Sequence, residues 1–85
     1  MNTIYNSPHY CVVEFSGFGD EVLHPAGGYE IMDKGQRREI FLGGEQAASF
    51  RQTVQALIAG EPTFDEVDAF LGGFSGIMNQ PVALH

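Results

Sequence analysis

Histidine and cysteine side chains are the first candidates for chemistry in this sequence. His9 and Cys11 are separated by one residue, so a strand would place both on one face, as the start of a zinc site. Zinc sites need three or four ligands at close motif spacing, and His24 and His85 are distant in the sequence. The sequence therefore favours a turn position for His9 and a buried position for Cys11, and it predicts no metal and no cofactor.

Acidic side chains are the second candidates. Asp65, Glu66 and Asp68 lie close together and could pair for acid-base catalysis. They also fall near the start of a predicted helix, where acids interact favourably with the helix dipole and face solvent. No serine lies in a Gly-x-Ser-x-Gly nucleophile motif. The sequence thus assigns no catalytic residue.

Basic side chains are few and clustered. Lys34, Arg37 and Arg38 are three of the four cations in a chain with a net charge of -7. The overall charge disfavours binding to nucleic acid or to an anionic membrane. The local cluster could contact phosphate or an acidic partner. In the favoured alternative, Arg38 pairs with Asp33 and the other two are solvated turn residues.

These side chains must be positioned by one small domain. The 85-residue chain has the size of a single domain, 1–85. We expect a sheet portion over 1–44 with a long loop at 16–28, two helices over 45–78, and a tail at 79–85. The single cysteine, the polar N-terminal segment and the lack of a long apolar run predict a cytoplasmic protein without an internal disulfide.

The central segment, 27–44, predicts a hairpin between two glycine pairs. A two-residue turn would set two glutamates directly opposite each other, whereas a four-residue turn at 34–37 sets Asp33 opposite Arg38. The second register is therefore preferred. It places Tyr29, Ile31, Ile40 and Leu42 on the face that we expect the helices to cover, and Glu30, Met32, Glu39 and Phe41 on the other face.

Strands and helices flank this hairpin. Residues 10–15 alternate as a strand, and residues 1–6 allow another. Helical spacing of apolar residues predicts a helix from 45 to Ala59 and a second from Thr63 to Met78, whose apolar stripe runs across two glycines. The predicted fold class is α+β, with an antiparallel three- to four-stranded meander followed by two helices packed on one face.

Two surfaces are predicted to meet other molecules. One is the basic tip of the hairpin. The other is the sheet face away from the helices, which we expect to form a homodimer contact, because dimerisation commonly supports so small a core. The candidate interaction residues are Lys34, Arg37, Tyr10, Val12, Met32 and Phe41.

The chain contains, in order, the segments IYNSPHYCVVEF, GGYEIMDK, RREIFLGG, FLGGF and QPVALH. As a set they resemble the successive blocks of a family of short, uncharacterised bacterial proteins of unknown function, over the whole chain. The resemblance implies a free-standing cytosolic bacterial domain. It implies no activity, ligand or site residue.

The apolar surface and the lack of a polar catalytic cluster favour a small non-enzymatic protein-interaction or regulatory protein of the bacterial cytoplasm, with an unidentified protein partner. The alternative is a small-ligand-binding domain or cryptic enzyme that uses the loop 16–28, where Asp20, Glu21 and His24 are titratable candidates. A flat apolar face would favour the first function, and a concave pocket under the loop would favour the second.

Overall fold

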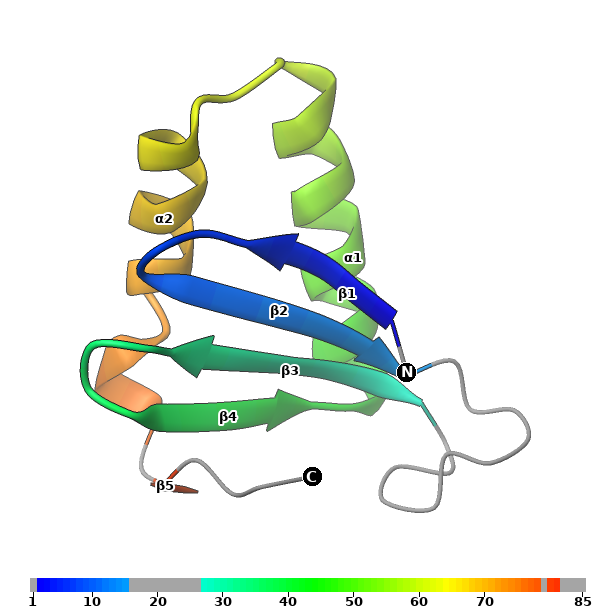
Figure 1. Ribbon diagram of the computed structural model, residues 1–85. Coiled ribbons are helices and arrows are strands. Elements are labelled where there is room, and N and C mark those ends of the chain that lie inside the picture. The colour runs from blue at the N-terminus through cyan, green and yellow to red at the C-terminus, as the bar shows by residue number, and fades with distance from the viewer. Residues whose placement is uncertain (1, 16–26, 79, 82–85) are drawn as a thin grey trace.

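A computed structural model describes residues 2–15, 27–78 and 80–81 of the protein. An antiparallel sheet comes first in the chain, and two helices then cover one of its faces (Figure 1). This arrangement confirms the predicted α+β class. The elements are β1 (Asn2–Asn6), β2 (Tyr10–Phe15), β3 (Gly28–Asp33), β4 (Arg38–Leu42), α1 (Gly44–Ala59), α2 (Phe64–Gly72), a 3-10 turn η1 (Ser75–Ile77) and β5 (Gln80–Pro81).

The described strands form a sheet in the order β1-β2-β3-β4-β5, in which every neighbouring pair is antiparallel. The sequence allows three or four strands in the meander, and β1 is the fourth. The two-residue β5 adds a short strand beside β4 and contains Pro81, whose nitrogen cannot donate to a ladder. The described sheet therefore has β1 at one edge and β5 at the other.

The hairpin register confirms the predicted four-residue turn. Residues 34–37 join β3 and β4, and Asp33 lies opposite Arg38. The ion pair expected between these two side chains does not form. Instead, the Asp33 carboxylate accepts a hydrogen bond of 3.0 Å from the backbone N–H of Gln36, which stabilises the turn locally.

The core lies between the sheet and the helices. Ile31 on β3 is fully buried, and Leu71 on α2 is 1% exposed. The ring of Phe50 on α1 lies 5.0 Å from that of Tyr29 and 5.9 Å from that of Phe70, so aromatic contacts join both helices to the sheet. The buried members of this core are Val12, Tyr29, Ile31, Leu42, Phe50, Leu71 and Met78.

The prediction that Tyr10 and Val12 of β2 belong to the homodimer surface is wrong. Val12 lies directly opposite Ile31 on β3, and opposite residues of paired strands share a face. Val12 and Tyr10 therefore face the helices and belong to the core or pack against it. Met32 and Phe41 lie on the opposite face, so the four residues do not form one surface. Local alternation cannot specify this register, because a long connection separates β2 from β3.

The sheet face away from the helices is also largely buried. Met32 and Phe41 on this face are half-buried, and the rings of Phe41 and Phe15 are 6.4 Å apart. This face thus offers a second subunit less apolar surface than the sequence suggests. Its buried residues are Val13, Phe15, Glu30 and Glu39.

Gly28 permits a close backbone approach at the start of β3. Its φ is +140°, and a Cβ atom there would lie 2.4 Å from the carbonyl oxygen of Leu42. Both the dihedral angle and the contact exclude a larger residue without a shift of the backbone. Glycine therefore fixes how closely β3 and the end of β4 pair.

The second helix ends earlier than predicted. It stops at Gly72, and a 3-10 turn from Ser75 to Ile77 replaces the expected last turns. Gly73 donates its N–H to the Phe70 carbonyl at 3.1 Å, a tighter bond that is common where a helix ends. Two adjacent glycines weaken the helix enough for this change. Met78 is still buried in the core, which explains why the apolar spacing continues past the helix.

Candidate functional site

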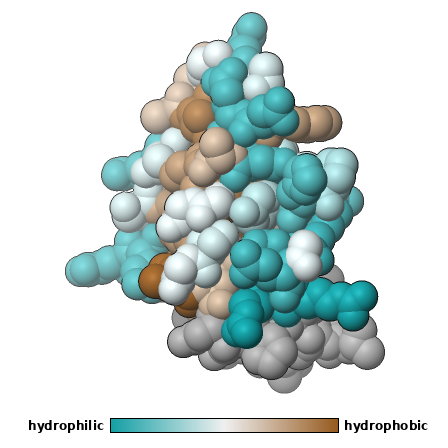
Figure 2. All heavy atoms as spheres, turned by 90° about the vertical axis from the view of Figure 1, so that its left-hand side faces the viewer, coloured by the Kyte–Doolittle hydropathy of each residue, from teal (hydrophilic) through white to brown (hydrophobic). Residues whose placement is uncertain are grey.

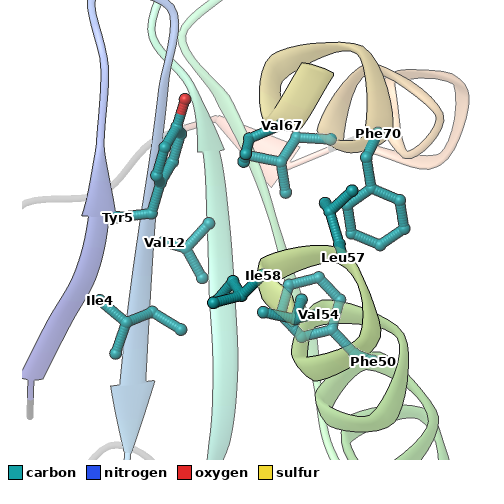
Figure 3. Close-up of a pocket in the computed structure, with 10 residues that line it drawn as sticks. Ile4, Tyr5, Val12, Phe50, Val54, Leu57, Ile58, Val67 and Phe70 are labelled. Atoms are coloured by element: carbon teal, nitrogen blue, oxygen red, sulfur yellow. The ribbon is translucent and has the colours of Figure 1, made fainter. Parts of the chain in front are cut away.

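An apolar groove lies between strand β1 and the adjoining ends of α1 and α2 (Figure 3). Ile4 and Tyr5 of β1 form one wall. Leu57 and Ile58 from the last turn of α1, with Val67 from α2, form the other wall. The floor and the inner sides consist of Val12, Phe50, Val54, Phe70 and Leu71. We call this feature the β1-helix groove.

The groove exists because α1 is longer than the four-stranded meander β1–β4 is wide. α1 has 16 residues, which corresponds to about 24 Å at 1.5 Å per residue. Four strands spaced about 4.8 Å apart span only about 14 Å between the outer two. In Figure 1, α1 runs across the strands, and both helices extend past β1. The apolar faces at these helix ends therefore have none of the described strands beneath them.

A bulge in β1 adds a further apolar side chain to the groove. The pairing of β1 with β2 shifts between Thr3 and Tyr5, so Ile4 has no partner in the ladder. An extra residue in one strand re-aims the neighbouring side chains. As a result, Ile4 and Tyr5 are adjacent in sequence and yet both line the groove (Figure 3).

Large hydrophobic side chains are exposed around the groove. Ile4 is 40% exposed, Ile58 is 61% exposed, and Phe64 at the start of α2 is 66% exposed. The Phe64 ring lies edge-on to the Tyr5 ring at 5.9 Å. Figure 2 shows apolar atoms gathered toward the upper part of the molecule, with hydrophilic atoms on both sides. Grouped exposed hydrophobic residues of this kind typically mark an interaction site.

The free volume of the groove is about 90 Å³. Pockets for drug-sized ligands are usually larger, roughly 300–1,000 Å³, and have a few convergent polar groups. Apart from the Tyr5 hydroxyl, the side chains that line this groove are aliphatic or phenyl groups. Its size and chemistry suit an apolar side chain of a partner protein.

A partly buried polar contact fixes the wall of the groove. Asp68 on α2 accepts hydrogen bonds at the same oxygen from the Tyr5 hydroxyl and from the Ser7 hydroxyl, both 2.8 Å long. Ser7 is only 4% exposed. Burial, followed by the hydrogen bond to Asp68, raises the pKa of Tyr5. This contact, which we call the Asp68 lock, ties α2 to the N-terminal hairpin.

The charge around the groove is negative. Glu61, Asp65 and Glu66 are exposed at the turn between the helices and at the start of α2. Thr63 caps α2, because its hydroxyl oxygen accepts the Glu66 N–H at 3.2 Å. The acids at 65 and 66 thus lie in the first helical turn, as expected. Asp68 instead has the locking role described above, for which the sequence gives no clear signal.

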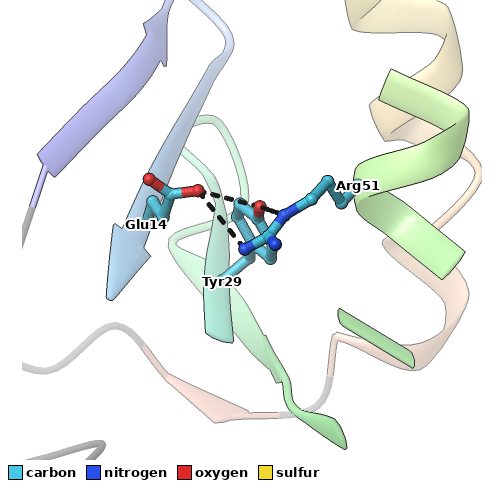
Figure 4. Close-up of polar contacts among 3 residues, drawn as sticks. All are labelled: Glu14, Tyr29 and Arg51. Carbon is cyan, nitrogen blue, oxygen red and sulfur yellow. Dashed lines mark hydrogen bonds and ion pairs between the residues drawn. The ribbon is translucent and has the colours of Figure 1, made fainter. Parts of the chain in front are cut away.

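A second polar cluster joins α1 to the sheet (Figure 4). The Tyr29 hydroxyl donates to the Glu14 carboxylate at 2.9 Å and accepts from Nε of Arg51 at 2.8 Å. Arg51 and Glu14 also form an ion pair at 3.8 Å. Burial raises the pKa of Tyr29, so this phenol stays protonated at neutral pH and is unsuited to act as a base. We interpret the cluster as a structural connection.

At the tip of the β3–β4 hairpin, Lys34 is less available for binding than the sequence suggests. Nζ of Lys34 donates to the side-chain oxygen of Asn6 and, at 2.7 Å, to the Ser7 carbonyl. This cation therefore connects the two hairpin turns. Arg37 is exposed beside Met32 and Lys34 at a shallow hollow, with a left-handed φ of 55°. A role for Arg37 in binding an acidic partner stays a prediction.

The other predicted sites lie partly outside the described residues. Asp20, Glu21 and His24 in the 16–28 loop, and His85 in the tail, belong to segments that the structure does not describe. Within residues 2–15, 27–78 and 80–81, no three His, Cys, Asp or Glu side chains are grouped so as to hold a metal ion. Cys11 is half-buried, and burial raises the pKa of its thiol.

Comparisons with known proteins give a family and no activity. Residues 1–85 match the family described as "Protein of unknown function (DUF3567)". A Burkholderia thailandensis protein that carries only a locus name is 56% identical over 85 residues, which cover 100% of both chains. No solved structure matches the chain. None of the described helices has the length and apolar character needed to cross a membrane.

Proposed function

Because the chain belongs to the DUF3567 family of proteins of unknown function, its role must be inferred from its surfaces, and we propose that it is a small non-enzymatic interaction protein of the bacterial cytoplasm. Its docking site is the β1-helix groove. A partner protein inserts an apolar side chain there and covers the exposed helix ends.

The observation that carries this proposal is the combination of exposure and concavity at one place. Ile4, Ile58 and Phe64 are among the most exposed large hydrophobic residues of the described chain. They surround or adjoin a hollow lined almost entirely by apolar side chains. Central apolar pockets that accept an anchor residue dominate the energetics of protein interfaces. Catalysis would instead need titratable groups directed into the hollow.

Affinity capture from the native cell tests the proposal with matched variants. Ile58→Gln and Phe64→Gln alter side chains that are largely exposed, so the fold should survive. We expect both variants to lose partners that the unaltered protein retains. Ile77→Gln is the control, because Ile77 is 55% exposed and lines a different hollow beside α1. Equal recovery of all partners by Ile58→Gln and Ile77→Gln would refute the groove as the docking site.

The oligomeric state is a separate question. A homodimer through the sheet face away from the helices stays a prediction, although Tyr10 and Val12 are removed from that surface. Only Met32 and Phe41 of the predicted set lie on it, and both are half-buried. Sedimentation of the unaltered protein and of a Met32→Gln variant measures whether such a dimer forms and whether it uses this face.

A further inference from the structure

We propose that the occupant of the β1-helix groove is an amphipathic helix of a partner protein, with an apolar anchor and with Lys or Arg residues beside it. This inference rests on the proposed function and specifies the chemistry of the partner. It follows from the shape of the β1 edge and from the distribution of charge.

The β1 edge favours side-chain docking over strand addition. A partner strand would need a regular row of backbone groups along β1. The bulge between Thr3 and Tyr5 interrupts the β1 ladder, and bulges are a common way to prevent strand pairing at an edge. The same bulge turns Ile4 into the groove. An amphipathic helix can use this arrangement, because it presents apolar side chains at intervals of three and four residues.

The charges specify the flanks of the partner helix. All four Lys and Arg residues lie from Lys34 to Arg51, and none follows Arg51 in the sequence. Lys34 is already bonded to Asn6 and Ser7. The nearby acids at 61, 65 and 66 are exposed at the helix ends. Basic residues next to the apolar anchor would therefore find complementary charge on this side of the protein.

The same charges disfavour the other occupants. A second copy of the chain would bring its own acids at 61, 65 and 66 against the first set, and such juxtaposed like charges oppose association. An anionic membrane would be repelled for the same reason. A basic amphipathic helix satisfies both the apolar hollow and its acidic surroundings.

Selection from a peptide library tests this inference. The full-length protein is immobilised and exposed to phage that display random peptides of about 16 residues, or about four helical turns. We expect enriched peptides to carry apolar residues at helical spacing together with Lys or Arg. The best peptide should bind Ile58→Gln about tenfold or more weakly, as expected for loss of a central contact, and should bind Ile77→Gln with unchanged affinity.

Charge variants then test the basic flanks. Asp65→Asn and Glu61→Gln should each weaken binding of that peptide about two- to fivefold, in the range of exposed ion pairs. Glu45→Gln, at the opposite end of α1, should leave binding unchanged. Raising the salt concentration should also weaken binding, because it screens exposed charges.

The possible failures have different meanings. Enriched peptides without net positive charge, but sensitive to Ile58→Gln, would overturn the proposed partner chemistry and leave the groove as a docking site. Enriched peptides that bind Ile58→Gln as tightly as the unaltered protein would overturn both proposals. No enrichment would overturn the helical-peptide partner, and the capture experiment would then decide the proposed function alone. A dimer that Ile58→Gln abolishes would identify a second copy as the occupant instead.

Discussion

The Asp68 lock makes a strong prediction about stability. One carboxylate oxygen accepts hydrogen bonds from Tyr5 and Ser7, both 2.8 Å long. Asp68→Ala removes both bonds and leaves the buried Ser7 hydroxyl without its short acceptor. We therefore expect α2 to be held less firmly against the N-terminal hairpin, and the free energy of unfolding to fall.

The size of this effect follows from the number and burial of the bonds. A hydrogen bond to a charged group contributes roughly 1.5–3 kcal/mol, and Asp68 and Tyr5 are only half-buried, so the lower value applies to each bond. Their combined loss is about 3 kcal/mol. A chain of this length has a stability of about 4–13 kcal/mol, and the midpoint of thermal unfolding should fall by about 12–24 °C.

Urea denaturation followed by circular dichroism measures the change. The matched control is Asp65→Ala, which removes an exposed acid from the same helix and should change stability by less than about 1 kcal/mol. A double-mutant cycle with Tyr5→Phe isolates the bond between Tyr5 and Asp68. Equal stability losses for Asp68→Ala and Asp65→Ala, or a coupling energy near zero in the cycle, would refute the lock.

Two further predictions concern the sheet. Gly28→Ala should destabilise the protein by more than about 2 kcal/mol, because φ is +140° and the new Cβ atom would lie 2.4 Å from the Leu42 carbonyl oxygen. Gly35→Ala is the control. Equal stability of the two variants would contradict the close approach. Since burial raises the pKa of Tyr29, the folded state keeps a proton that the unfolded state loses near pH 10. The contribution of this group to the free energy of unfolding should therefore be constant below about pH 10 and should fall as the pH rises further. Tyr29→Phe should reduce the slope of unfolding free energy against pH between about pH 9 and 11. An unchanged slope would contradict the raised pKa of Tyr29.

The hairpin could be predicted from the sequence because its determinants are local. Charge pairing and turn length select one register, and the structure places Asp33 opposite Arg38 as expected. The side-chain interaction at that point could not be predicted. The Asp33 carboxylate has a backbone donor nearby, the Gln36 N–H at 3.0 Å, and such a short-range bond competes well with an exposed ion pair.

Two sequence predictions are wrong, the face on which Val12 lies and the end of α2, because long-range packing decides them. The face of Val12 depends on pairing across the long connection between β2 and β3, whose length does not determine which residues become opposite. The end of α2 depends on whether packing compensates for Gly72 and Gly73. In the structure it does not, and Met78 reaches the core through a 3-10 turn. Periodicity alone cannot distinguish these paths, because both bring Met78 to the core.

The groove was not predicted, although the sequence contains a signal for it. The helical spacing that includes Ile58 and Phe64 reads as core, since both residues continue an apolar stripe. Comparing the helix length with the sheet width leads to a different interpretation of this stripe. A 16-residue helix of about 24 Å is longer than a four-stranded sheet is wide. One end of the apolar stripe of α1 must then be uncovered. The bulge that brings Ile4 to this place has no comparable sequence signal.

The lock and the groove share Tyr5, and this connection bears on how the groove could bind. The Tyr5 ring lines the groove, while its hydroxyl donates its single proton to Asp68 at 2.8 Å and lies 3.3 Å from the Phe64 carbonyl oxygen. The groove wall is thus held in place by polar bonds that do not depend on a partner. A site ordered in advance loses less conformational entropy on binding. Without the lock, the projecting helix ends would have few contacts to hold them, because none of the strands in the described part of the chain lies beneath them. We therefore interpret the Asp68 lock as the feature that allows apolar side chains to stay exposed in a fixed arrangement, which a docking surface requires and a simple packing defect does not.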